Sequence, residues 1–174
     1  MKVGLNLLTE EAFKRVPGWW PRAYISLLLF MYFRESGYVV PAYSLRKKAQ
    51  EVGLGKTTLY KGLDTLIKEG LIKKKDSLYI LTEDGYQVLT ILNDFENELK
   101  NNIDKVGVLD KIKEETITKL KNLKEIIKGK GIECSFIDHT ITYVEAYIKT
   151  IKSYIAEIVL EIIKSLVTEI LQTE

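Results

Sequence analysis

The sequence contains very few of the residues that form covalent cross-links, metal sites and chain breaks. Among 174 residues it has one cysteine, Cys134, one histidine, His139, 3 prolines and 11 glycines. A single cysteine cannot form a disulfide within the chain, and one cysteine with one histidine cannot complete the usual zinc ligand set. Few prolines and glycines favour long regular elements. We therefore expect a largely helical chain in the cytoplasm, with no metal and no cofactor.

No hydrophobic run is long enough to cross a membrane. The most apolar window, residues 24–33, is ten residues long and is closed by Arg22 and Arg34, whereas a spanning helix needs about 20 residues. The composition, 46% hydrophobic and 29% charged, is typical of a folded chain rather than a disordered one. The length allows one core or two small modules. We expect no membrane contact.

The chain as a whole has little net charge, but positive charge is concentrated in one segment. Lysine and arginine outnumber aspartate and glutamate by only 26 to 24, a net charge of +2. Between Pro41 and Ile80, nine bases and four acids give +5, which leaves −3 for the rest of the chain. A polyanionic partner would therefore have to bind this middle segment.

The residues before and within this segment predict short elements. A helix is expected to begin at Thr9 and a second to cover residues 21–35. Residues 38–40 are β-prone and precede a proline, which predicts an edge strand. A short basic helix follows, with Ser44 as its expected N-cap and Gly53 at its end.

Residues 56–69 predict a helix with one apolar and one polar face. Leu59, Leu63 and Leu66 recur at spacings of four and three, which places them on one side. The polar and basic residues between them point to the opposite side. One face is therefore expected to pack, and the other to bind.

Residues 71–82 predict a β-hairpin. Two short runs, 71–75 and 78–82, flank the dipeptide Asp76-Ser77, and three lysines lie on the first run. The order of strand, basic helix, tight turn, second helix and hairpin is the layout of a winged helix-turn-helix. In that layout one helix enters the major groove of DNA and the hairpin reaches the flanking backbone.

The residues of this segment resemble the winged-helix transcription regulators, most closely the PadR-like branch, with a MarR-like assignment as the alternative. The likeness lies within residues 24–92, less than half of the chain, in Tyr60-x-x-Leu63, Glu69-Gly70-Leu71-Ile72 and Tyr79-x-Leu81-Thr82-x-x-Gly85. The resemblance implies dimerisation through C-terminal helices and reading of DNA by Lys56, Thr57, Tyr60 and Lys61. Lys61 departs from the proline usual at its position, and the hairpin loop is short.

The residues expected to contact double-stranded DNA lie on the basic helix, the second helix and the hairpin. They are Arg46, Lys47, Lys48, Lys56, Thr57, Thr58, Tyr60, Lys61, Lys73, Lys74 and Lys75. Two basic runs thus flank the outer side of the second helix, where phosphates would lie. The alternative for this segment is a winged helix that binds protein.

Residues 83–174 predict a helical oligomerisation region. Thr82 is the expected N-cap of its first helix, a second helix covers about residues 109–128, and Gly129-Lys130-Gly131 precedes the last helix. Steps of three and four separate the apolar residues of the predicted dimerisation stripe, which are Ile141, Val144, Ile148, Ile151, Ile155, Ile158 and Ile162. Flanking apolar residues widen the stripe, which favours a multi-helix bundle.

No arrangement of residues predicts catalysis. Residues 53–58 resemble the end of a phosphate-binding P-loop, but Gln50 stands where its first glycine is required. The carboxylates mostly lie three or four residues from a lysine, as ordinary helix-surface pairs do. Trp19, Trp20, Tyr24 and Tyr32 predict core or interface packing; in PadR-like proteins such residues can line an effector cavity between subunits. The chain is not expected to be an enzyme.

Together these features predict a mainly α-helical protein in two parts. Residues 1–82 form a winged helix-turn-helix DNA-binding domain with a small β-hairpin wing, and residues 83–174 form a helical dimerisation or oligomerisation region. The expected function is sequence-specific DNA binding by a dimeric transcriptional regulator, a repressor. The alternative is a DNA-binding structural adaptor in plasmid or chromosome segregation or replication, whose C-terminal helices recruit a protein partner.

Overall fold

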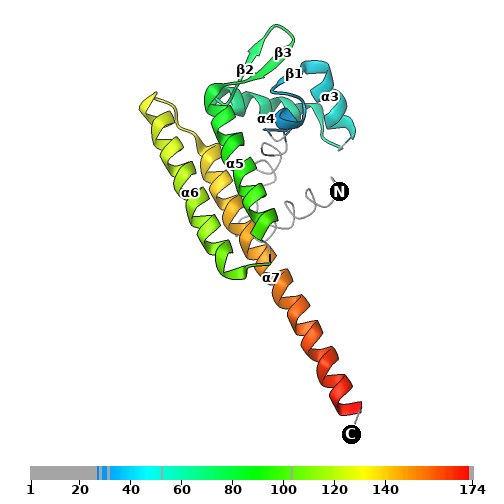
Figure 1. Cartoon of the computed structure of the whole chain (residues 1–174). Coiled ribbons are helices and arrows are strands. Elements are labelled where there is room, and N and C mark those ends of the chain that lie inside the picture. Colours follow the sequence, from blue (N-terminus) through cyan, green and yellow to red (C-terminus); the bar gives the residue numbers. More distant parts are fainter. Residues whose placement is uncertain (1–26, 28, 31, 52, 103, 173–174) are drawn as a thin grey trace.

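The computed structural model describes residues 27, 29–30, 32–51, 53–102 and 104–172. The chain is mainly helical, with one small antiparallel sheet and a long C-terminal helix (Figure 1). In chain order the elements are β1 (Val39–Pro41), α3 (Ala42–Glu51), α4 (Lys56–Lys68), β2 (Ile72–Lys75), β3 (Leu78–Leu81), α5 (Glu83–Asn102), α6 (Val106–Gly129) and α7 (Ser135–Gln172). The described residues between 27 and 35 are helical, as predicted. The helix expected at Thr9, together with Trp19, Trp20 and Tyr24, lies outside the described residues.

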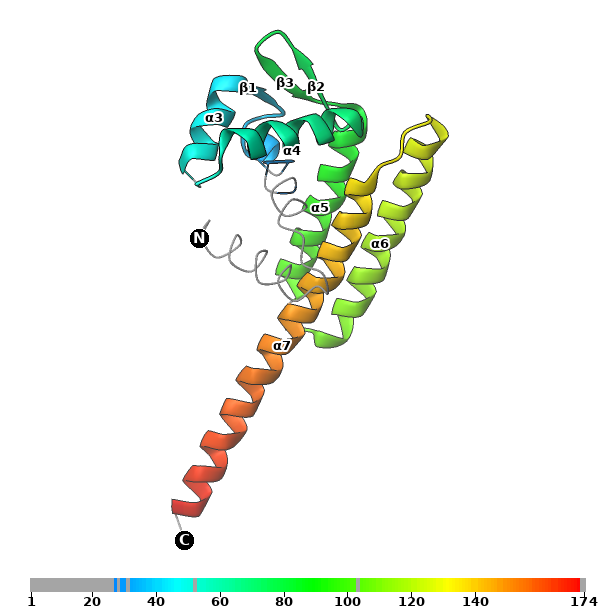
Figure 2. The ribbon, with the colours of Figure 1, turned by 180° about the vertical axis from the view of Figure 1, so that it is seen from behind.

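The sheet and the two short helices form a head at one end of the molecule (Figures 1 and 2). The strand order is β1-β3-β2, with both pairs antiparallel, so β1 is an edge strand as predicted. Val40 lies opposite Tyr79 on the buried side of the sheet. The two-residue turn of the hairpin is also as predicted, and Asp76 takes a φ of 55° in it, a conformation that aspartate tolerates better than most residues.

Helices α3 and α4 pack their predicted apolar residues into the head. Leu59, Leu63 and Leu66 of α4 are each no more than 1% exposed. Helix α3 begins at Ala42, two residues before the predicted N-cap Ser44, and that prediction is wrong. The Ala42 N–H donates to the carbonyl oxygen of Ser77 at 2.8 Å. The hairpin turn therefore accepts a hydrogen bond from one of the otherwise unpaired N–H groups of the first turn of α3, which lets the helix begin before Ser44.

Helices α5, α6 and α7 lie side by side as a bundle below the head (Figures 1 and 2). The predicted N-cap at Thr82 is confirmed, because its Oγ1 accepts a hydrogen bond from the N–H of Gly85 at 3.1 Å. The apolar side chains of α5 that face the core are buried from Val88 to Leu99. The α6 helix ends at Gly129, within the predicted breaker.

The head and the bundle share one hydrophobic core. The rings of Phe30 and Phe136 meet edge to face with their centroids 4.9 Å apart. The Arg34 guanidinium donates to the carboxylate of Glu96 at 2.7 Å and to the side-chain oxygen of Asn93 at 2.9 Å. The two predicted parts are therefore joined by apolar and charged contacts rather than by a linker.

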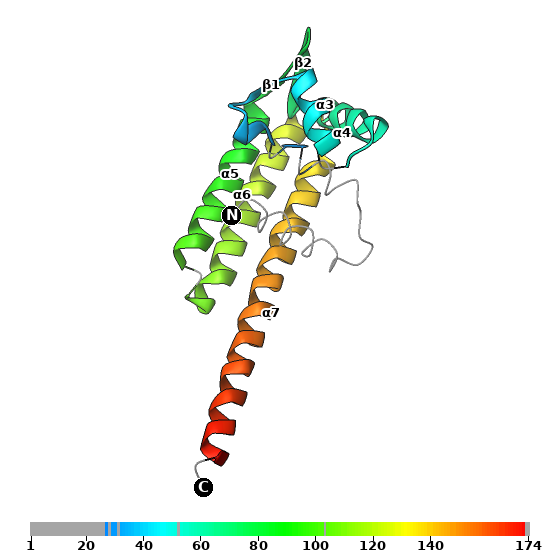
Figure 3. The same ribbon diagram turned by 90° about the vertical axis from the view of Figure 1, so that its right-hand side faces the viewer.

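Helix α7 is only partly covered by its own bundle. Its 38 residues span about 57 Å at 1.5 Å per residue, and it extends well past α5 and α6 (Figure 3). Side chains facing the bundle are buried as far as Ile151, whereas every residue from 156 to 172 is exposed. We call residues 156–172 the tail.

Burial along α7 corrects the predicted dimerisation stripe. Val144, Ile148 and Ile151 are at most 8% exposed because they pack inside the bundle of their own chain. Ile141 and Ile155 are half-buried against the same core, while Ile158 and Ile162 are 60% and 54% exposed. Only the last part of the stripe can meet a partner without unfolding the protomer.

Candidate nucleic-acid interface

The outward face of α4 carries polar and basic residues at its N-terminal end. Lys56, Thr57 and Lys61 are exposed, while Thr58 and Tyr60 are half-buried beside the apolar face. All five predicted contact residues of this helix therefore lie in its first two turns. The structure brings them together on a helix whose other side is held by the leucine core.

Helix α3 supplies the first group of flanking bases. Arg46, Lys47 and Lys48 are all exposed. The ammonium of Lys48 lies 3.9 Å from the carboxylate of Glu51 and 5.9 Å from the centre of the Tyr32 ring. These weak contacts hold Lys48 near the end of its own helix. Arg46 and Lys47 are therefore the stronger candidates of the three for phosphate contact.

The three hairpin lysines do not form one row. In the ladder, Lys74 lies opposite the buried Tyr79, and its ammonium is 5.7 Å from the centre of that ring. Side chains alternate across a strand, so Lys73 and Lys75 lie on the other, outer face. The predicted DNA contact at Lys74 thus lies on a different surface from those at Lys73 and Lys75, and the two-residue period of the strand could have revealed this.

The charge of the head surface is more positive than its sequence suggests. Of the four acids between residues 41 and 80, Glu69 is 7% exposed and faces the bundle. Nine bases therefore share the head surface with three exposed acids. Neither α3 nor α4 has an acidic residue in its first turn, so nothing there neutralises the positive end of the helix dipole.

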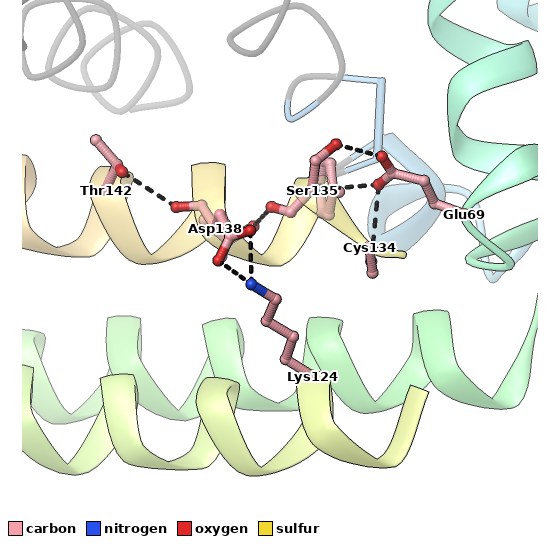
Figure 4. Close-up of polar contacts among 8 residues, drawn as sticks. Glu69, Lys124, Cys134, Ser135, Asp138 and Thr142 are labelled. Carbon is pink, nitrogen blue, oxygen red and sulfur yellow. Dashed lines mark hydrogen bonds and ion pairs between the residues drawn. The ribbon is translucent and has the colours of Figure 1, made fainter. Parts of the chain in front are cut away.

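Glu69 holds the first turn of α7, a role that sequence reasoning missed (Figure 4). Its carboxylate accepts hydrogen bonds from the backbone N–H of Phe136 at 2.8 Å and from the Ser135 hydroxyl. A carboxylate at a helix N-terminus satisfies unpaired N–H groups and opposes the helix dipole. Because Glu69 is the C-cap of α4, this contact ties the end of α4 directly to the start of α7. We call it the Glu69 joint.

Cys134 lies in the same joint, where burial lowers the reactivity of its thiol. Its thiol is 3.7 Å from the Glu69 carboxylate. Burial raises the pKa of Cys134 to about 12, and the negative charge of Glu69 acts in the same direction. The thiolate is the reactive form of cysteine, so a raised pKa suppresses its chemistry.

We expect Cys134 to react with a thiol reagent only when the joint opens. At about pH 8, labelling of the native protein should be at least about 100-fold slower than labelling of a small free thiol. The rate is followed by the absorbance of the released reagent, and denaturant provides the control because it should restore fast labelling. Fast labelling of the native protein would contradict the burial of this side chain.

Two other kinds of feature, a metal site and a membrane-spanning helix, are absent from the described part of the chain. Among the described residues, no group of three or more histidine, cysteine, aspartate or glutamate side chains is placed to hold a metal ion. No helix within the described ranges has the length and apolar character needed to cross a bilayer. Comparison with protein-family models, with curated proteins and with solved structures found no match to this chain.

Proposed function

We propose that this protein is a sequence-specific double-stranded DNA-binding protein of the winged helix-turn-helix type, a homo-oligomeric transcriptional regulator that acts as a repressor. The observation that carries the proposal is the outward face of α4. Exposed lysine and threonine side chains occupy its first two turns, and two elements that contact α4, α3 and β2, also carry exposed bases. A helix flanked by bases in this way suits the major groove and the phosphates on either side.

The contacts divide into two kinds. Lys61 lies in the second turn of α4, where a side chain can reach a base edge. Lys73 and Lys75 lie on the outer face of the hairpin and would meet only phosphates. Base contacts discriminate between sequences, whereas phosphate contacts strengthen binding to any duplex.

Replacing Lys61 and Lys73 separately by alanine should weaken binding in different ways. Lys61→Ala should cost on the order of 1–3 kcal/mol on the preferred site with little loss on random duplex. Lys73→Ala should weaken binding to both duplexes alike and lower the salt slope by about one unit. Titrations against specific and random duplexes at several salt concentrations measure both effects.

The control is Lys119→Ala, which removes an exposed lysine from α6 in the bundle and should change neither quantity. If Lys61→Ala weakens binding to the specific and the random duplex equally, Lys61 does not contact a base edge. If the parent protein binds no duplex at all, the protein-binding alternative for the winged helix replaces this proposal. If the protein instead coats DNA continuously and without preference for a site, the alternative function, a DNA-binding structural adaptor, is favoured.

A further inference from the structure

The tail presents the largest exposed apolar surface of the described residues. Nine of its aliphatic side chains are between 49% and 69% exposed. They are Ile158, Val159, Leu160, Ile162, Ile163, Leu166, Val167, Ile170 and Leu171. A contiguous surface of this kind on a protein in water marks an interaction site. Figure 3 shows that the tail extends beyond both neighbouring helices of its own bundle.

The apolar surface is too wide for a single partner helix. At 100° per residue, the apolar residues from Ile155 to Leu171 cover roughly 220° of the circumference. The polar side chains gather on the remainder except Glu169, which lies within one edge of the apolar arc. A two-stranded coiled coil uses a much narrower seam. The tail therefore has apolar side chains to bury on two sides.

The heptad pattern also indicates that each tail packs against two neighbouring helices. With Ile163 at position a and Leu166 at position d, the flanking positions g and e hold Ile162 and Val167. The pair at a and d would by itself suit two strands, but two-stranded coiled coils carry charged residues at e and g. Apolar residues on both flanks instead fit a bundle in which each helix touches two others.

The charge of the tail distinguishes a protein partner from a membrane. The tail has one base, Lys164, and three acids, Glu157, Glu161 and Glu169. Helices that lie on anionic membranes carry lysine and arginine on their polar face. A net charge of −2 would instead be repelled by such a surface, so the apolar face fits a protein.

Among the described residues, a second tail is the best apolar complement to the tail. Elsewhere in the described residues, the large exposed apolar side chains occur singly or in a small group on the head, at Tyr38, Val39, Tyr43, Tyr86 and Ile126. None of these offers a surface as long as the tail. Identical tails match one another in length, in apolar width and in the position of their polar side.

We propose that the tails of four copies pack together as a four-helix bundle, so that the protein is a tetramer with four heads. Each tail then buries its wide face against two neighbours and the centre, with Glu157, Glu161 and Lys164 in solvent and Glu169 at one margin of the buried face. Tetramers with two-fold symmetry are the commonest closed assemblies after dimers. On the proposed DNA-binding function, on which this step rests, four heads hold two separate duplex segments at once.

The assembly is tested by light scattering on the full chain. The parent should have a mass of about 80 kDa, four times the 20.0 kDa of one chain. Ile163→Glu combined with Val167→Glu should reduce the mass to about 20 kDa, because one charge would enter the centre of the bundle and the other its contact with a neighbouring helix. The matched control, Ser165→Glu with Thr168→Glu, adds the same charges on the polar side and should stay at the parent mass.

The apolar-side variant changes residues that are about half exposed, so its helical circular dichroism should remain that of a folded chain. A parent mass of one, two or three chains would overturn the proposal, as would a double variant that stays tetrameric. Pelleting of the parent with vesicles of mixed neutral and anionic lipid would also overturn it, in favour of a membrane.

Bridging is tested separately. An immobilised duplex should capture a second, labelled duplex when the parent is present, and the double variant should bind one duplex without capturing the other. If the tetramer forms but binds no duplex, the proposed function fails and the assembly stands. If a duplex is bound by a monomer, dimer or trimer, the assembly fails and the proposed function stands.

Discussion

Replacing Gly85 by alanine is expected to lower the free energy of unfolding by about 3 kcal/mol. A Cβ at Gly85 would lie 2.1 Å from the carbonyl oxygen of Leu71 and 2.9 Å from a methyl group of Leu81. The same Leu71 oxygen accepts the N–H of Thr82 at 3.0 Å, so it cannot move away without breaking that bond. The added methyl group would therefore force the start of α5 away from the hairpin. Chemical denaturation followed by circular dichroism, at one fixed protein concentration, measures the loss.

Gly107→Ala is the matched control for this substitution. Gly107 also lies in the first turn of a helix, α6, but a Cβ there would meet no atom within 4 Å. Alanine favours helix over glycine by roughly 1 kcal/mol, so this variant should be as stable as the parent or slightly more stable. If Gly85→Ala is equally harmless, the close approach of α5 to Leu71 is incorrect.

Removing the carboxylate of Glu69 is expected to cost about 2–3 kcal/mol of stability. In Glu69→Ala, the buried N–H of Phe136 loses its acceptor, and the Ser135 hydroxyl loses the same partner. The first turn of α7 would then have no cap from the head. Denaturation curves measure the loss, and hydrogen exchange should show faster exchange at the start of α7.

Two further variants separate capping from charge. Glu69→Gln keeps an acceptor oxygen and should lose about 1 kcal/mol, mainly the interaction of the charge with the helix dipole. Glu133→Ala removes an exposed acid that lies just before α7 and should change stability by less than Glu69→Ala. If Glu133→Ala loses as much stability as Glu69→Ala, then negative charge near the helix end, rather than the buried hydrogen bonds, stabilises the joint.

Elements set by nearby residues could be predicted from the sequence. The spacing of Leu59, Leu63 and Leu66 placed the buried face of α4 correctly, because helical periodicity depends only on neighbours a few residues apart. The cap at Thr82 and the turn at Asp76 follow from local backbone chemistry in the same way. The exposed residues of the candidate DNA interface on α4 follow from the same periodicity.

Features that depend on distant partners could not be predicted. Glu69 and Phe136 are separated by 67 positions, and no local pattern indicates that a glutamate after one helix caps another. Along α7 the apolar stripe continues without interruption, yet its first half packs on α5 and α6 while its last part is exposed. Periodicity shows that a face is apolar, but only the fold decides which helix covers it.

Because α7 is long, a small rotation at the Glu69 joint moves the far end of the helix by a large distance. A straight helix of about 57 Å that rotates by about 5° at one end moves its other end by about 5 Å. That displacement is roughly one and a half base-pair steps of DNA, at 3.4 Å each. If the tails are held together as proposed, the displacement appears at the heads instead. On the proposed DNA-binding function, a rotation of a few degrees at Glu69 would then shift α4 out of register with a groove. The buried hydrogen bonds of Glu69, together with the shared core and the Arg34–Glu96 contact, therefore limit how far two distant heads can shift relative to each other.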